Sequence, residues 1–154
     1  MAFLFSTGAK IRMMDSGFVS GWADGLALIF GGTPPTDPSN GTTGTLLAKV
    51  GIDPLNWIAG SATGEGITFD AADAAGDVYA NLASPLVAKG VATGTARFFW
   101  LVPNVAGADG VGASAVIARI QGLAGVGSGE MRLSSAEFTA SSTSNASFAV
   151  FRFP

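Results

Sequence analysis

The chain has 154 residues and a formal charge of -3, and only 12% of its residues are charged, where about 25% is typical of soluble domains. It contains neither cysteine nor histidine, which excludes disulfides, thiolate metal sites and every catalytic pair that uses an imidazole. Eight basic residues stand against eleven acidic ones. This balance argues against nucleic-acid binding, which needs clustered lysine and arginine.

The length is typical of one domain, so we expect a single domain over residues 1–154. The mean hydropathy of +0.44 is high, but glycine, proline or a polar residue interrupts every apolar segment before 18 residues, so no membrane partner is expected. No basic stretch precedes the short apolar patch at residues 3–5, which disfavours a signal peptide. A chain that is poor in charge and holds 22 glycines is typical of proteins buried in a permanent assembly, since interfaces are depleted of charged residues. A weakly charged monomer is the alternative.

The first elements in chain order frame a long loop. Residues 1–14 read either as a first strand or short helical turn packed on the core, or as an arm that docks on a neighbouring subunit, because chain ends become ordered only when something holds them. Residues 26–30 predict a compact strand, residues 31–44 a proline-rich surface loop, and residues 44–51 a second strand. The two strands form a wide hairpin or a connection between sheets.

The strongest strand prediction is residues 95–102, which hold three adjacent aromatics between turn signals. Both of its faces are apolar, so it either lies between two covering layers or has its outer face covered by another subunit. Residues 115–120 predict its antiparallel neighbour. Four glycines in residues 122–129 predict a flexible turn. Further short strands are predicted at residues 66–70, 77–83, 130–134, 136–140 and 147–154, with a polar turn at residues 141–145.

These elements predict an all-β protein: a single-domain antiparallel β-sandwich of the jelly-roll or Ig-like kind, with residues 1–14 as an N-terminal docking arm in one of the two interpretations above. No linker divides the chain into separate apolar sets.

No motif predicts a chemical reaction. Asp70, Asp73 and Asp77 lack the spacing of a calcium loop, and the glycine-rich residues 122–129 lack the Gly-Lys-Ser/Thr of a phosphate loop. Pairs such as Glu65 and Asp70 are the remaining basis for a carboxylate glycosidase. Two acidic residues do not identify a catalytic pair unless the distance between their carboxyl groups is known. We therefore expect no enzyme, and no catalytic, cofactor-binding or metal-binding residue.

Two blocks of sequence, from Leu28 to Ala48 and from Asn81 to Phe99, together resemble small structural proteins of tailed bacteriophages. The first runs from Leu28 to Ala48, with Gly31-Gly32-Thr33-Pro34-Pro35 and Thr43-Gly44-Thr45-Leu46-Leu47 on either side of a polar loop. The second has Asn81-Leu82-Ala83-Ser84-Pro85-Leu86 followed by residues 92–99. The sequence departs from the family after Trp100, before residue 26 and after Ser141.

The resemblance implies a virion component, namely a capsid decoration or cement protein that binds and stabilises the assembled head. Its expected partners are the major capsid protein and copies of itself, and its expected location is the capsid surface of a virion assembled in the host cytoplasm. The alternative is a tail or host-recognition module whose loop at residues 31–44 binds a receptor or glycan, with Trp22, Trp57 or Tyr79 exposed for stacking. Since aromatic residues anchor interfaces, the residues expected to contact partners are Phe3, Phe5, Trp100, Phe151 and Phe153.

Overall fold

The computed structural model describes residues 3–81 and 85–148, and the backbone of residues 151–152. Its helices are α1 (Thr7–Ser16) and α2 (Phe18–Gly21), with a short 3-10 turn, η1 (Pro38–Asn40). The strands are β1 (Leu4–Phe5), β2 (Leu26–Phe30), β3 (Leu46–Gly51), β4 (Asp77–Val78), β5 (Val87–Gly90), β6 (Gly94–Thr95), β7 (Phe98–Val102), β8 (Ile120–Val126), β9 (Met131–Leu133), β10 (Glu137–Phe138), β11 (Thr143–Phe148) and β12 (Phe151–Arg152).

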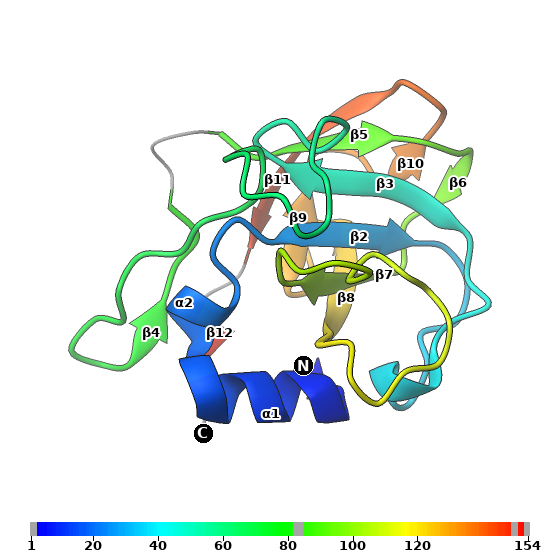
Figure 1. Ribbon diagram of the computed structural model, residues 1–154. Coiled ribbons are helices and arrows are strands. Elements are labelled where there is room, and N and C mark those ends of the chain that lie inside the picture. Colours follow the sequence, from blue (N-terminus) through cyan, green and yellow to red (C-terminus); the bar gives the residue numbers. More distant parts are fainter. Residues whose placement is uncertain (1–2, 82–84, 149–150, 153–154) are drawn as a thin grey trace.

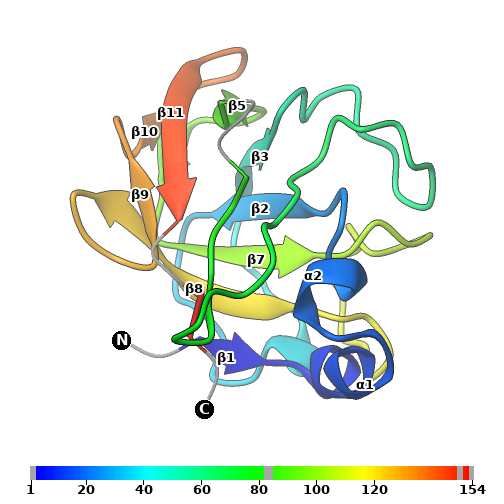
Figure 2. The ribbon, with the colours of Figure 1, turned by 90° about the vertical axis from the view of Figure 1, so that its left-hand side faces the viewer.

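Seven of these strands close into a barrel (Figure 1). Around the ring the order is β8, β7, β2, β3, β5, β11 and β9, and β9 pairs with β8 again. The closing pair β8–β9 is parallel, whereas the other neighbours in the ring are antiparallel. Strand β1 lies outside the ring and pairs with β8, and α1 and α2 lie together near one end of β7 and β8 (Figure 2).

The predicted all-β class is confirmed, but the predicted β-sandwich, whether jelly-roll or Ig-like, is wrong. Alternating apolar residues show that a strand has a buried face, and they do not show whether the sheet closes on itself. Closure depends here on residues 122–129, which we expected to form a flexible turn. Their first half continues β8, and the rest returns the chain so that β9 pairs with β8 in parallel.

The two apolar faces of the central strand β7 belong to two different clusters. Phe99 and Leu101 belong to the cluster that fills the barrel, together with Ala27 and Ile29 of the neighbouring β2. The alternate residues of both strands form an outer cluster that the chain's own loops cover, through Trp57 and Ala108 among others. Of the two readings left open by the sequence, the structure therefore supports a strand between two covering layers of the same chain.

A glycine in β8 makes room for the Phe99 ring inside the barrel. A Cβ at Gly122 would lie 2.7 Å from Cε1 and 2.9 Å from Cζ of Phe99, and 3.0 Å from the Cβ of Glu130. Real Cβ atoms do not approach other atoms so closely, and forcing extra volume into a packed interior costs about 1–3 kcal/mol. Strand β8 therefore contains glycine because Phe99 occupies the space that a side chain would need.

Several strand predictions are confirmed and others are wrong. Strands β2 and β3 form where they were expected and pair as a wide hairpin. Strand β8 pairs with β7 as predicted, but it begins at Ile120 and not at residue 115. Residues 66–70 form only isolated bridges, and the expected polar turn at residues 141–145 lies mostly in β11.

The N-terminal segment, from Phe3 on, lies on the chain's own barrel. Leu4 and Phe5 pair with Gln121 and Ile120 of β8, and α1 follows at once. The strand and the helical turn that the sequence allowed here are both present, and the helix is longer than expected. The backbone of this segment therefore extends the barrel with a strand and a helix.

Candidate interaction surface

Helix α1 begins and ends at residues that favour helix termini. Ser6 precedes it with an extended backbone, and its hydroxyl oxygen accepts a hydrogen bond from the Ala9 amide at 3.1 Å. Gly17 ends the helix with φ +70°, and its amide donates to the Met13 carbonyl. A serine N-cap and a glycine in the left-handed region are the usual signals for a helix start and stop. These signals were present in the sequence, but they do not reveal which face the helix buries.

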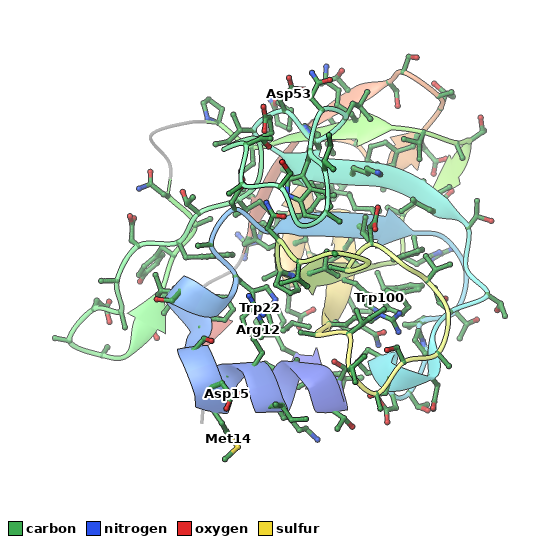
Figure 3. The ribbon with its side chains drawn as sticks, viewed as in Figure 1. Arg12, Met14, Asp15, Trp22, Asp53 and Trp100 are labelled. Atoms are coloured by element: carbon green, nitrogen blue, oxygen red, sulfur yellow. The ribbon has the colours of Figure 1, made fainter. Side chains whose placement is uncertain are left out.

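One side of α1 packs on the protein and the other is apolar but exposed. Gly8 and Ala9 are buried, and the Arg12 guanidinium donates through Nε to the Gly21 carbonyl of α2 at 2.5 Å. On the opposite side Ile11 is 52% and Met14 is 89% exposed. Figure 3 shows Met14 pointing away from the body of the molecule while Arg12 points toward it. This face therefore presents two large apolar side chains to solvent.

A groove of about 250 Å³ runs beside this exposed face, between α1 and the segment that leads to β8. Ile11, Arg12 and Asp15 line one side of it, and Val116, which is 85% exposed, lies on the other. We call Ile11, Met14 and Val116 the helix patch. Large apolar side chains that gather at one place on a surface mark sites of association.

A second apolar group lies on the loop between β3 and β4, and we call Ile52, Leu55 and Ile58 the loop patch. They are 36%, 53% and 61% exposed. The loop is held in place because the indole of Trp57, which is buried, donates to the Asp24 carbonyl at 2.8 Å. Asp53 of this loop and Met14 of α1 lie at opposite ends of the molecule (Figure 3). The protein therefore carries two separate apolar patches.

Asp24 connects the loop that carries this patch to the rest of the protein. Its carboxylate accepts hydrogen bonds from the amides of Gly64 and Gly66 and from the side-chain amide of Asn104. Asn104 in turn accepts from the Gly60 amide. Asp24 has a positive φ of 55°, a conformation that asparagine and aspartate tolerate better than most residues. Its partners are all within the protein, so we assign it a structural role.

The residues predicted to contact partners have different environments. Trp100 is fully buried in the outer cluster of its own chain, so this fold does not offer it to a partner. Phe3 and Phe5 are half-buried against the barrel cluster, and the Phe3 ring meets Phe99 edge-on with centroids 6.4 Å apart. The side chain of Phe151 and the whole of Phe153 lie outside the described residues.

The burial of Trp100 accompanies that of Arg119, which sequence reasoning did not single out. The guanidinium lies over the Trp100 ring at 4.4 Å from its centroid and donates to the carbonyls of Pro38, Gly110 and Gly112. Burial lowers the pKa of Arg119, since desolvation disfavours the charged form. The Trp100 indole donates to Gln121, whose amide donates to the Pro35 carbonyl. This network attaches the proline-rich loop and the segment after β7 to the barrel.

The proline-rich loop also ends against α1. The Ser39 hydroxyl accepts from the Thr7 amide at 2.9 Å, at the first turn of the helix. The Ser39 amide donates to Asp37 at 2.8 Å, and this bond is the main reason why the pKa of the Asp37 carboxyl is lowered, with smaller effects of the Ser39 side chain and of the Lys10 charge. The loop is therefore built into the body of the protein.

A groove of about 740 Å³ lies between the start of this loop, β6 and the end of β8. A neighbouring groove of about 450 Å³ shares Gly32, Thr95 and Arg97 with it. Arg97 is exposed, and only its backbone is used in the barrel, through bonds to Phe30 and Ala124. Among the residues that the structure describes, the Arg97 guanidinium makes no hydrogen bond, so it is available to a ligand that enters either groove.

The three aspartates considered for a cation have different environments, and Asp77 is buried in β4. Asp73 accepts from the amides of Ala75 and Asp77, and Asp70 accepts from the side chain of Asn81. In the part of the chain that the structure describes, no group of three or more acidic side chains is placed to hold a metal ion.

Comparison with protein-family models, with curated proteins and with solved structures found no match to this chain. The resemblance to phage structural proteins therefore rests on the two sequence blocks alone. Neither α1 nor any other helix within the described residues has the length and hydropathy needed to cross a membrane.

Proposed function

We propose that the protein is a structural component of a bacteriophage virion, a capsid decoration or cement protein that binds the assembled head and stabilises it. The observation that carries the proposal is the pair of separate apolar patches on a chain with only 12% charged residues. A protein that reinforces a shell has to bind the shell and its own neighbours, and two exposed patches at opposite ends provide two contacts. The resemblance of the two sequence blocks to phage structural proteins is the reason for proposing a phage head as the particle.

The mechanism requires no chemistry from the side chains. A ligand that binds only the assembled shell stabilises it by RT ln(1 + [L]/Kd), so every apolar contact that lowers Kd raises the free energy of disassembly. We assign the shell contact to the loop patch, because Trp57 and Asp24 hold its backbone in a fixed position and little conformational entropy is lost on binding.

The test compares phage heads that carry the protein with heads stripped of it. Decorated heads should withstand higher temperature and sharper osmotic shock, and adding the purified protein back should restore that resistance. Leu55→Glu and Ile58→Glu should abolish binding to stripped heads, because they place a charge at the contact. Val126→Glu changes an apolar side chain of similar exposure, 60%, elsewhere on the barrel, and it should bind normally. Heads that are equally stable with and without the protein would disprove the proposal.

The second candidate is a tail or host-recognition module, and the observation that favours it is the pair of grooves at Arg97 beside the loop at residues 31–44. Of the three aromatic residues expected to stack on a glycan, two are buried, since Trp22 and Trp57 are 0% and 4% exposed. Tyr79, which is exposed, follows β4, on the other side of the molecule from η1 (Figure 1). A receptor bound through Arg97 would be an anionic or strongly hydrogen-bonding one. Arg97→Ala should then reduce binding of the purified protein to host cells. Unchanged binding would exclude this second candidate and leave only the decoration function.

A further inference from the structure

The exposed residues of α1 follow the pattern of a short coiled-coil seam. Ile11 and Met14 are three residues apart, as are positions a and d of a heptad, and both are exposed. Lys10 then occupies position g and Asp15 position e, and both are exposed charged residues at the two edges of the apolar face. In two-stranded parallel coiled coils, a and d form the apolar seam while e and g carry opposite charges that pair between helices.

We propose that two copies of this chain associate through α1, with the two helices parallel and related by a two-fold axis along them. Ile11 and Met14 of each copy face the same residues of the other across the axis. Lys10 of each copy pairs with Asp15 of the other, so the interface holds two equivalent ion pairs. The contact is isologous and closes on itself as a dimer.

The charges decide the direction of pairing. In a parallel pair, a residue at position g faces position e of the partner five residues further on, and Lys10 and Asp15 are five residues apart in the sequence. Antiparallel helices related by a two-fold axis would place Lys10 beside Lys10 and Asp15 beside Asp15, because each edge of the face then meets the same edge of the other helix. The parallel pairing is therefore the one in which the opposite charges meet.

The groove beside α1 lies on the edge that the proposal requires. It runs along the Asp15 side of the helix, where Val116 and Ile11 form its apolar rim. In the dimer the partner's Lys10 enters at this edge, so its aliphatic stem packs on the rim while its ammonium group reaches Asp15. Figure 3 shows that Asp15 lies next to Met14 at the end of α1, on the outside of the molecule.

The contact is small. A helix of ten residues is about 15 Å long, so the buried area is below the roughly 800 Å² per partner that is standard for stable complexes. We therefore expect a dimer with a Kd in the micromolar range that gains strength when many copies are held on one particle. The inference deepens the proposed function by identifying one of its partners, but it is tested on the purified chain alone.

The first test measures self-association of the full chain by sedimentation equilibrium from micromolar to millimolar concentration. The wild-type chain should form dimers reversibly, and Ile11→Glu or Met14→Glu should raise the Kd by at least about tenfold. Ile58→Glu is the matched control for Ile11→Glu, since it places a charge on an isoleucine of similar exposure, 61% against 52%, in the loop patch, and it should dimerise normally. Lys10→Asp and Asp15→Lys should each weaken the dimer, and the double variant should recover much of the lost affinity, because it exchanges the two charges across the interface. Recovery should be incomplete, since residue 10 then repels Asp37 of its own chain, which Lys10 attracts. A wild-type chain that stays monomeric up to millimolar concentration would overturn the proposal.

The second test determines the direction of the helices. The chain has no cysteine, so a single introduced thiol reports only its own neighbours. Under mild oxidation Met14→Cys should form a disulfide-linked dimer efficiently, and Ile58→Cys should not. If Met14→Cys couples only to Ile11→Cys and not to itself, the helices are antiparallel and the parallel arrangement is wrong. Neither result depends on phage heads, so loss of the dimer and loss of head stabilisation are separate outcomes.

Discussion

Arg119 shows how a single buried charge organises the outer layer of this protein. Its side chain is fully buried, and its guanidinium donates to three backbone carbonyls and covers the Trp100 ring. Burying a charge costs several kcal/mol unless hydrogen bonds replace its hydration. The carbonyls provide those bonds for Nη1 and Nη2, whereas the buried Nε has no hydrogen-bond partner within the described residues. Through these bonds Arg119 fixes two loops to the barrel. Two irregular segments therefore depend on this buried charge.

We predict that Arg119→Met lowers the free energy of unfolding by about 3 kcal/mol, because methionine fills part of the space but leaves three carbonyls without a donor. Arg97→Met is the control, since Arg97 is exposed, and it should change stability by less than about 0.5 kcal/mol. Chemical denaturation gives both values. Hydrogen exchange should also become faster in residues 31–45 and 103–117 of Arg119→Met, and unchanged exchange there would show that the loops are held by other contacts.

At the scale of elements, Ser6 connects α1 to β8. Its hydroxyl oxygen accepts from the amides of Ala9 and Arg119, at 3.1 Å and 2.9 Å, and its hydroxyl donates to the Ile117 carbonyl at 3.0 Å. One buried side chain thus caps the helix and binds the start of the strand. This connection orients α1 and the helix patch relative to the barrel.

We expect Ser6→Ala to lower the free energy of unfolding by about 2 kcal/mol, since an N-cap contributes about 1 kcal/mol and a second buried amide also loses its acceptor. In a chain of 154 residues this corresponds to a fall in Tm of roughly 4–8 °C. Ser16→Ala, at the exposed end of the same helix, should leave Tm nearly unchanged. Equal melting temperatures for the two variants would mean that packing alone holds the helix.

Sequence patterns identified correctly those elements whose own residues strongly favour one secondary structure. The strand predicted at residues 26–30 is present, and of the strand predicted at residues 95–102 the apolar part, residues 98–102, forms β7, because β-branched and aromatic residues favour strands. Ser6 and Gly17 flank α1, but they were not recognised as helix ends from the sequence. The residues between them show no apolar stripe on the packed side, because the large apolar side chains Ile11 and Met14 lie on the exposed face. The apolar exposed face, which made the helix hard to predict, is also what defines the helix patch. The loop patch could not be predicted, since the role of Trp57 as an anchor depends on contacts distant in sequence.

For the whole molecule, the pattern of strands left the architecture undecided. A sandwich and a barrel both use short strands of alternating apolar and polar residues. They differ in whether the two edge strands of the sheet pair with each other. Here that contact is the parallel pair β8–β9, joined by residues 127–130 only. Parallel neighbours ordinarily need a connection of about a dozen residues or more. The short return is achieved with Gly127 and Gly129, which have φ of +68° and +86°.

Gly127 and Gly129 lie in the short connection that forms this closing seam. A Cβ at Gly129 would lie 2.7 Å from the Leu123 carbonyl oxygen, whereas one at Gly127 would meet nothing within 4 Å. Both positions have positive φ, so alanine costs about 1–2 kcal/mol at either from backbone strain alone, and the difference between them measures the clash at the seam. We expect Gly129→Ala to lose about 2 kcal/mol more than Gly127→Ala. If the seam closes the barrel, the amides of β9 should exchange faster in Gly129→Ala while those of β2 and β7 stay protected. Equal losses in the two variants, with uniform exchange, would show that the glycines serve the turn and not the closure.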